Sequence, residues 1–447
     1  MRETGDVRIV PVLLGATETP GRVHRAPGGR LSLRTPNRLE VHDRAAFLAG
    51  VRAPVDALDL PPGAHAGPAP GGGFVVAEAA RVRAVAPDGT TRWELPHDTW
   101  HGGHRPPRAP GAPAPDPSGR LVAVAVPTLL PEEEVAARAV AVQDGPPRRG
   151  HGHDRLLLLD AGTGTVRAEQ PVAAVAGALA LEWHAGGALL AASFWTAWYG
   201  WAGYWAEPSD GGLRTLGVAA DRHEVVGFVP GSSRVVTLRR AEWMAVDDDR
   251  YELALHDARA TAGAVASPVA SLDLNDLSWD AENDDFGSAH VLDGSHLLVT
   301  ADWVPREGPL EHTHWLLSAD TLRPLGRLRY PCPVDDTVTP LGDGTWLTRD
   351  GDRLRHWRLG EGSPRSWSGH GAAAAGGAAG RAAELLGAAH AARAGAGAPL
   401  PAAERYDVDR VWARCLAALG PGAAATAFAR GEAHDPKRLP AALPADA

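Results

Sequence analysis

The sequence predicts an all-β fold in which repeated four-stranded units, or blades, stack around a central axis. The first observation is a degenerate unit, in which an apolar strand ends in an Asp turn and a second strand follows. Its clearest copies are LEVHDRAAFLAGV, LLLLDAGTGTV, LALHDARATAGAV and WLLSADTLRPLG, at residues 39–51, 156–166, 253–265 and 315–326. The second observation is size, because a single domain built from most of 447 residues requires a closed or repetitive all-β fold. Together they predict a seven-bladed β-propeller over residues 7–360.

Runs of β-forming residues bounded by Gly, Pro and Asp divide the propeller into blades. The expected blades span residues 22–54, 55–96, 112–173, 178–220, 223–274, 286–331 and 335–359. In blade one, FLAGVR at residues 47–52 is expected to be the outermost strand. Blade seven shows only three convincing strands. Its fourth comes either from the N-terminal run VRIVPVLL (Val7 to Leu14), which we favour, or from RSWSG (Arg365 to Gly369). Closing the ring removes exposed sheet edges.

The composition changes abruptly after Gly360 and predicts a low-complexity and helical tail. Residues 361–401 are rich in Ala and Gly and are expected to be a linker, with at most one loose helix. Residues 402–419 are expected to form an amphipathic helix that docks either on the propeller or on a partner. Its apolar face comprises Val408, Val411, Trp412, Cys415, Leu416 and Leu419. Residues 420–447 are expected to be disordered.

The charge and the cysteine content exclude several classes of function. The 44 basic and 54 acidic residues give a net charge of −10 with no basic stripe, so nucleic-acid or acidic-membrane binding is not expected. Cys332 and Cys415 are far apart and offer no disulfide framework. The chain shows neither a secretion signal nor an apolar run of about 18 residues, and a cytoplasmic protein is expected. The preference for Arg over Lys, with much Ala, Gly and Pro, is typical of a GC-rich bacterial genome.

The repeats resemble those of the WD40, YVTN and PQQ-like β-propeller superfamily over residues 7–360. The segment VRAVAPDGTTRWEL (residues 82–95) is similar to a PQQ-type repeat, and LLLLDAGTGTV is similar to the strand–turn–strand unit of all three groups. The Gly-His start and Trp-Asp end of true WD40 repeats are missing, because Trp279-Asp280 lies in a connection. The resemblance therefore implies a fold and not a function.

The order of the strands places the unusual segments on one face of the ring. If strands a to d run outward from the axis, the b–c and d–a connections share a face. The expected b–c insertions are residues 127–154, 196–205, 240–250 and 302–314, and the notable d–a connections are residues 97–105, 275–285 and 330–336. The turns of the other face are expected to be short and ordinary. Long loops on one side of a rigid scaffold are typical of a binding surface.

Tryptophan is the first candidate for binding chemistry, with 15 Trp against five Tyr and six Phe. Trp195, Trp243 and Trp303 each follow a strand b, which favours packing between blades. The unrepeated insertion at residues 196–205 favours a protein-docking surface, although stacking on sugars is an alternative. The leading hypothesis is a non-catalytic scaffold that binds a protein partner through its loop-rich face. The binding residues would be Trp198, Tyr199, Trp201, Tyr204, Trp205, Trp243 and Trp303.

Histidines and carboxylates support an alternative from a different class. The two histidines of a His-x-His pair at a strand end point to one side, and three histidine clusters would share the loop-rich face. The candidates are His101, His104, His151, His153, His312 and His314. They lack HExxH spacing, so solvated loop histidines are the favoured interpretation, and no cofactor beyond a weakly indicated divalent metal is expected. The alternative function is a hydrolase or lyase acting on a carbohydrate or peptide at the channel mouth, with metal or a carboxylate pair.

Overall fold

The computed structural model divides the chain into two compact units, Met1–Glu361 and Gly362–Ala447. It describes residues 8–100, 109–127, 154–172, 176–196, 200–209, 212–220, 222–239, 251–260, 265–277, 284–303, 311–360, 379–395 and 421–433, together with Val408, Trp412, Cys415, Leu416 and Leu419. Within these residues no helix is both long and apolar enough to cross a membrane.

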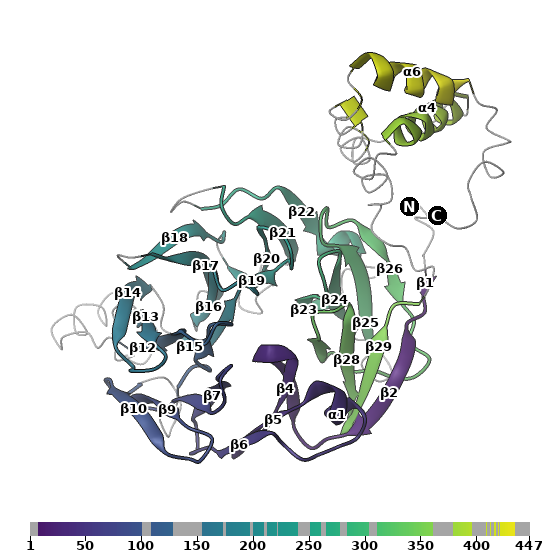
Figure 1. The fold of residues 1–447 in the computed structure, drawn as a ribbon. Helices are drawn as coiled ribbons and strands as arrows, with labels where there is room; N and C mark the ends of the chain where they lie inside the picture. The colour runs from purple at the N-terminus through teal and green to yellow at the C-terminus, as the bar shows by residue number, and fades with distance from the viewer. Residues whose placement is uncertain are drawn as a thin grey trace, which may run out of the picture. The chain divides into compact units, whose positions relative to one another are not determined.

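Seven antiparallel sheets arranged in a ring form the first unit, which is a seven-bladed β-propeller as the repeats predict (Figure 1). Blade one contains β3 (Arg22–Ala26), β4 (Arg30–Thr35), β5 (Arg38–His42) and β6 (Asp56–Asp59). Blade two contains β7 (His65–Pro68), β8 (Phe74–Ala77), β9 (Arg81–Val85) and β10 (Thr91–Pro96). Blade three contains β11 (Ala114–Pro115), β12 (Leu121–Val126), β13 (Asp154–Asp160) and β14 (Val166–Val172).

The second half of the ring repeats the same arrangement. Blade four contains β15 (Ala176–Trp183), β16 (Leu190–Thr196), β17 (Gly200–Ser209) and β18 (Gly212–Val218). Blade five contains β19 (His223–Phe228), β20 (Arg234–Arg239), β21 (Glu252–Asp257) and β22 (Ala270–Asp273), followed by the 3-10 helix η2 (Leu274–Leu277). Blade six contains β23 (Asp284–Val291), β24 (His296–Trp303), β25 (Glu311–Ser318) and β26 (Pro324–Leu328), and blade seven contains β27 (Val338–Pro340), β28 (Thr345–Asp350) and β29 (Arg353–Arg358).

An N-terminal strand completes blade seven, as predicted, but its position along the chain differs from the prediction. Strand β2 (Val12–Glu18) pairs antiparallel with β29. The preceding strand β1 (Arg8–Ile9) pairs in parallel with β26 of blade six instead. Pro11, which cannot donate a ladder hydrogen bond, lies in the break between the two strands. The alternative strand at residues 365–369 lies outside the described residues.

The predicted outermost strand of blade one is wrong, because most of that segment belongs to a helix and its following turn. The Asp43 side chain accepts a hydrogen bond from the backbone N–H of Ala46 and caps helix α1 (Arg44–Leu48). Phe47 of this helix is fully buried in a cluster with Leu31 and Leu347, between blades one and seven. The capping Asp therefore outweighs the β-propensity of the segment, and β6 is the outermost strand.

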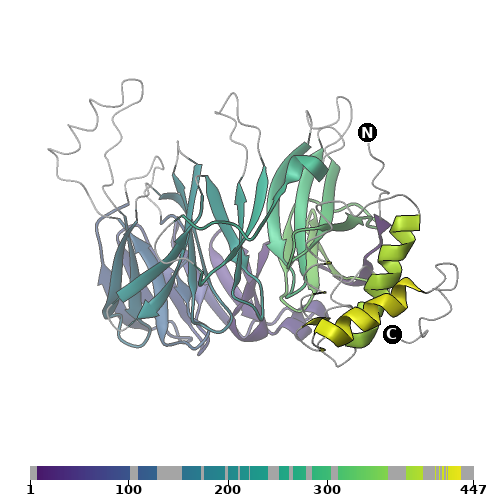
Figure 2. The same cartoon turned by 90° about the horizontal axis from the view of Figure 1, so that it is seen from above.

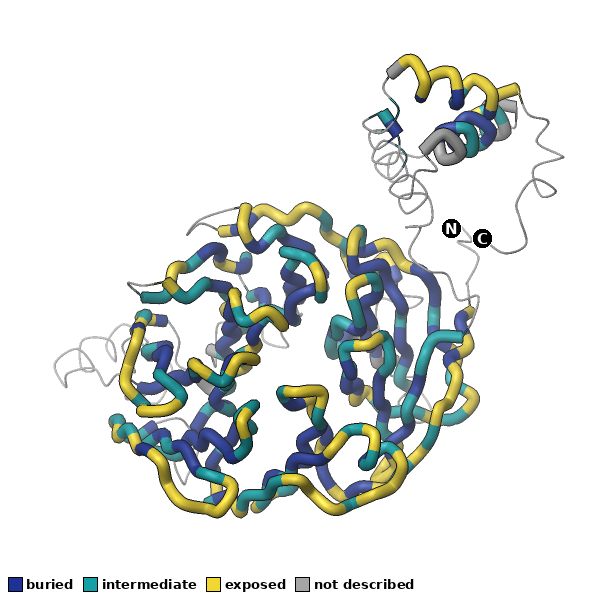
Figure 3. The backbone as a smooth tube through the Cα atoms, in the orientation of Figure 1, coloured by how far each residue is buried: buried dark blue, intermediate teal, exposed yellow. Residues whose placement is uncertain are grey.

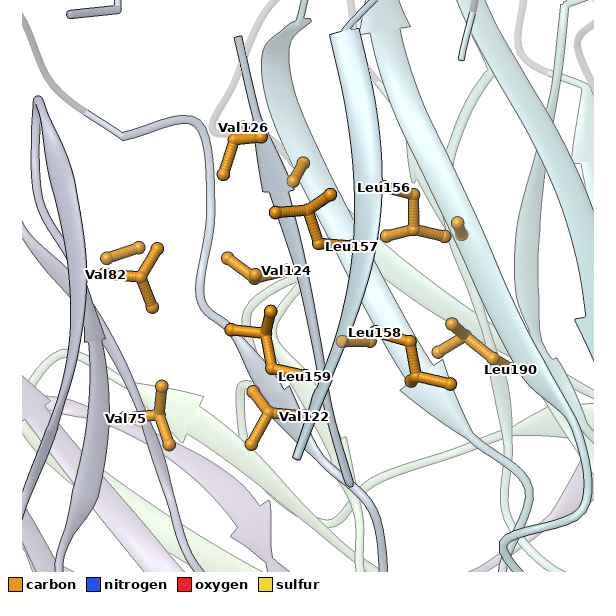
Figure 4. Packing of buried hydrophobic residues seen from close by; sticks show 14 of the residues in the cluster. Val75, Val82, Val122, Val124, Val126, Leu156, Leu157, Leu158, Leu159 and Leu190 are labelled. Carbon is orange, nitrogen blue, oxygen red and sulfur yellow. The ribbon is translucent and has the colours of Figure 1, made fainter. Parts of the chain in front are cut away.

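The core of the propeller lies between blades, where clusters of buried apolar side chains each join neighbouring sheets. The largest cluster joins blades two, three and four (Figure 4). Its central strands, LVAVAV and RLLLLD, are apolar on both faces, so they read as continuous hydrophobic runs rather than alternating ones. In Figure 4, Val82 of blade two approaches Val124 of blade three, and Leu156 and Leu158 point toward Leu190 of blade four.

The connections between strands fall on two opposite faces of the ring (Figure 2). We call the face with the a–b and c–d connections the turn face, and the face with the b–c and d–a connections the loop face. The a–b turns are short, such as the 3-10 turn η1 (Pro27–Gly29). However, the c–d connections at residues 43–55 and 258–269 are long. The prediction that the turn face carries only short turns is therefore wrong for blades one and five.

The second unit is more ordered than the sequence predicts. Helix α4 (Ala379–Gly395) lies within the predicted linker, and helix α6 (Pro421–Glu432) lies within the predicted disordered tail. Pro421 is favoured in the first turn of a helix, and Ala is the best helix former. The two helices share a small core with the segment between them, and its buried and partly buried members are Ala383, Leu386, Val408, Trp412, Cys415, Leu419, Ala427 and Phe428. Four residues of the apolar face predicted for residues 402–419, namely Val408, Trp412, Cys415 and Leu419, thus pack within the tail.

Replacing Gly387 by Ala is expected to separate α4 from α6. A Cβ at Gly387 would overlap the carbonyl oxygen of Phe428, and overpacking of about 1–3 kcal/mol should raise the open population about fivefold or more. The thiol of Cys415, which is buried, should then react faster with Ellman's reagent in a Cys332→Ser background. Gly422→Ala is the matched control, because a Cβ there meets nothing within 4 Å. Equal labelling rates for the two variants would contradict this packing.

Candidate functional site

Trp205 is a packing residue and not part of a docking surface, which corrects its predicted role. The expected insertion at residues 196–205 is mostly β-strand, because β16 ends at Thr196 and β17 begins at Gly200. Only 1% of Trp205 is exposed. Its indole Nε1–H donates to the carbonyl oxygen of Ala258, 3.1 Å away, in the c–d connection of blade five. Trp205 therefore ties blade four to blade five.

Trp201 and Tyr204 occupy the same strand and are partly buried. Trp201 lies directly opposite Trp195 in the β16–β17 ladder, and the two rings meet edge to face with centroids 5.7 Å apart. Tyr204 stacks on Phe194 at a centroid distance of 5.8 Å. Burial raises the pKa of the Tyr204 hydroxyl. Trp201 lies near the loop face, at the end of the hairpin, and is the one predicted binding residue whose described side chain remains partly exposed there.

Three of the other predicted binding residues lie outside the described part of the chain, and for the fourth only the backbone is described. Trp198, Tyr199 and Trp243 lie outside the described residues, as do the metal candidates His101, His104, His151 and His153. Trp303 is the last residue of β24, where only the backbone is described.

Several indoles donate hydrogen bonds across blade boundaries, which accounts for part of the tryptophan excess. Trp93 of blade two donates to the Ala161 carbonyl oxygen of blade three at 2.9 Å. Trp183 of blade four donates to the Ala114 carbonyl oxygen of blade three at 2.8 Å. A large apolar ring with one N–H donor fits these positions, because each blade boundary is apolar but contains backbone carbonyl groups at its rim.

His312 and His314 do not form a metal site with each other. His314 is fully buried, and its Nδ1 lies 2.7 Å from the Tyr330 hydroxyl. Trp346 Nε1–H donates to the same hydroxyl at 3.0 Å, so we assign the Tyr330 hydroxyl as donor to Nδ1 of a neutral His314. Burial, together with the neighbouring His290 and His312, lowers the pKa of His314 to about 3. No group of three or more metal-ligating side chains occurs among the described residues.

A cavity of about 630 Å³ occupies the central channel, in a position that the sequence does not single out. Its lining comes mainly from the innermost strands of blades one, four, five, six and seven, and β16 of blade four also contributes. The polar residues that line it are His24, Arg25, Glu182, His184, Ser193, His290 and Thr339. Most of them lie at or just beyond the C-terminal ends of their strands, which lead into the a–b turns. The cavity therefore lies toward the turn face, and exposed residues appear along the inner strands in Figure 3.

Glu182 is the acidic residue of the cavity lining, and its pKa is raised. Its side chain is exposed to the channel, yet protein encloses it at longer range, and this desolvation raises the pKa of Glu182 to about 7. The charge of Arg25 opposes the shift. A carboxyl group with a perturbed pKa inside a cavity is a functional-site candidate.

The histidines of the cavity add polar groups to its lining. Burial lowers the pKa of His24, and the charges of Arg22 and Arg34 lower it further. His184 accepts a hydrogen bond at Nδ1 from the backbone N–H of Gly186, and its ring meets Phe228 edge to face. Because the pKa of Glu182 is about 7, its carboxyl group is only partly ionised at neutral pH, where the charge of Arg25 acts on it.

Sequence reasoning missed this cavity because its residues are scattered and none belongs to a loop cluster. Glu182 and His184 occur in ALEWHAGG and Arg25 occurs in RVHRAPGG, each directly before a glycine turn. The available signal was positional. Charged residues near the end of an innermost strand lie beside the channel, whereas charged residues of outer strands face solvent.

Comparisons with known proteins give the fold alone. No protein-family model matches the chain, and no curated protein matches it. Among solved structures, BamB from Moraxella catarrhalis is 13% identical, with 76% of this chain and 85% of that chain covered and a TM-score of 0.42. BBS1N, solved in complex with ARL6DN, is 10% identical, with 80% and 100% covered and a TM-score of 0.46. The Pan2 WD40 domain of Neurospora crassa is 12% identical, with 82% and 98% covered and a TM-score of 0.41.

The fold and the site define a class of protein: a seven-bladed β-propeller with a charged cavity at one end of its channel. Its resemblance to WD40 and PQQ-like propellers is one of fold.

Proposed function

We propose that this protein is a non-catalytic scaffold that docks a protein partner through the loop face of the propeller. The observation that carries the proposal is the distribution of the connections. The two longest connections between described strands, residues 97–113 and 127–153, both leave the ring on the loop face. Long connections on one side of a rigid ring supply variable contact surface without disturbing the blades. We also propose that the protein resides in the cytoplasm.

The Trp195–Trp201 pair is the described part of the proposed docking surface. Both side chains are partly exposed and lie near the loop face. Aromatic side chains at such positions supply contact area at a low entropic cost, and Trp is enriched among residues that dominate binding energy. Trp198 and Tyr199, which lie between this pair in the sequence, extend the proposed surface. Trp243, in the b–c connection of blade five, and Trp303, at the end of β24, complete it.

Replacing Trp198 and Trp201 together by Ala is expected to weaken partner binding by about thirtyfold or more, because hot-spot aromatic residues contribute about 2 kcal/mol or more. The measurement is affinity capture with quantitative mass spectrometry, using the full chain and the Trp198→Ala/Trp201→Ala double variant. Val269→Ala, an exposed substitution on the turn face, is the control. Proteins captured by the wild type and the control should be lost from the double variant. Identical captured sets for all three proteins would overturn the proposal.

A further inference from the structure

The turn-face end of the channel has the dimensions of a small-molecule site. Its volume of about 630 Å³ falls within the range of about 300–1,000 Å³ that is typical of ligand pockets. Between its charged groups the lining is largely apolar, and Leu181, Val226, Phe228 and Val291 contribute to it. An apolar pocket with a few polar groups at fixed positions is the usual form of such a site.

Two opposite charges belong to blades on opposite sides of the cavity. Arg25 comes from β3 of blade one, and Glu182 comes from β15 of blade four (Figure 1). Their charges act on each other. Nevertheless, within the described part of the chain neither side chain forms an ion pair or a hydrogen bond with another residue. Both residues are exposed to the channel, so their charged groups are accessible to a ligand.

Each charged group packs against a glycine of a neighbouring blade. A Cβ at Gly227 of blade five would lie 2.8 Å from a Glu182 carboxylate oxygen, and a Cβ at Gly342 of blade seven would overlap the Arg25 guanidinium. Both glycines have positive φ angles, of 152° and 81°. A side chain at either position would displace the charged group beside it, so each glycine leaves room for that group.

We propose that this cavity binds a small zwitterion, an amino acid or a short peptide, with its carboxylate on Arg25 and its ammonium group on Glu182. A guanidinium binds a carboxylate through two parallel hydrogen bonds, and a carboxylate accepts from an ammonium group. A ligand with only one charge would leave the other protein group unpaired, whereas a zwitterion satisfies both. The apolar lining accommodates the carbon atoms that join the two charges. The site lies toward the turn face, so its test is independent of docking on the loop face.

The test uses isothermal titration calorimetry on the full chain with probes of increasing charge separation. The probes are glycine, β-alanine, 4-aminobutyrate, 6-aminohexanoate, diglycine and triglycine, and acetate, methylammonium and inorganic phosphate are the singly functional controls. One zwitterion should bind best, about tenfold or more tighter than acetate or methylammonium, because only it forms both charged contacts. At pH 7 its binding should release protons, since an ammonium group favours the ionised form of Glu182.

Variants identify the groups involved. Glu182→Gln and Arg25→Gln should each weaken binding of that zwitterion about tenfold or more. The matched controls are Glu207→Gln and Arg214→Gln, which neutralise an ion pair on the outer strands β17 and β18 and should leave affinity unchanged. Proton release should disappear in Glu182→Gln. Circular dichroism and the melting temperature verify folding of every variant.

Three outcomes would overturn the proposal. The first is a dissociation constant above about 10 mM for every zwitterion, which corresponds to negligible affinity. The second is binding of acetate or phosphate that depends on Arg25 but is unchanged in Glu182→Gln, which would define an anion site. The third is zwitterion binding that survives both Glu182→Gln and Arg25→Gln, which would place the ligand elsewhere.

Discussion

Replacing Trp205 by Ala is expected to destabilise the propeller by about 3–5 kcal/mol, the range typical of a large aromatic residue removed from a core. Trp205 is 1% exposed and belongs to the cluster that joins blades four and five. The substitution leaves a cavity at that boundary and removes the donor to the Ala258 carbonyl oxygen. The indole of Trp205 packs closely against Gly217 of the neighbouring strand β18, because a Cβ at that position would overlap the ring. Urea unfolding followed by far-ultraviolet circular dichroism measures the change.

Trp201→Ala is the matched control, since it removes the same side chain from the same strand at a partly exposed position. Its expected effect is about 0.5–1.5 kcal/mol, the value of an aromatic pair such as Trp195–Trp201. Trp205→Phe should lie between the two, because the ring remains while the N–H donor is lost. Equal unfolding midpoints for Trp205→Ala and Trp201→Ala would refute the assignment of Trp205 as a residue that joins blades.

The fold was predictable because its determinants are local and repeated. Each blade contains apolar strands of the right length and turns rich in Gly, Asp and Pro, and seven copies leave little freedom in how they assemble. The errors occur where one residue changes local structure. Asp43 caps a helix in place of a strand. In the tail, Gly387 and Gly431 allow α4 and α6 to approach closely. From composition alone, the same glycines indicate a flexible linker.

The candidate site was much less predictable, because its residues are adjacent only in three dimensions. Glu182 and Arg25 are separated along the chain by three blade boundaries, and neither belongs to a recognisable motif. The sequence predicts aromatic binding residues instead, and one of them, Trp205, packs between two blades. A count of Trp does not distinguish a binding surface from a blade boundary, because both favour a large ring with one N–H donor.

Lowering the pH from 7 to 5 is expected to destabilise the propeller through His314. Burial lowers the pKa of His314 from 6.5 to about 3, so the unfolded chain takes up this proton at a pH at which the folded protein does not. The stabilising contribution is complete above about pH 6.5 and is lost progressively as the pH falls toward 3, by about 1.4 kcal/mol per pH unit. Protonation in the folded state would require Nδ1 to give up the hydrogen bond from the Tyr330 hydroxyl, which also accepts from Trp346.

His314→Phe isolates this contribution, because the variant keeps a ring of similar size and cannot titrate. Its stability at pH 7 should be lower by about 1–3 kcal/mol, since the Tyr330 hydroxyl loses its acceptor. Between pH 7 and 5, however, wild-type stability should fall by about 2 kcal/mol more than that of His314→Phe. Other histidines with lowered pKa values, His24, His97, His256 and His356, titrate in both proteins and cancel in the difference. Tyr330→Phe keeps a titrating His314 and should retain the steeper pH dependence, whereas parallel curves for wild type and His314→Phe would show that His314 is not the responsible group.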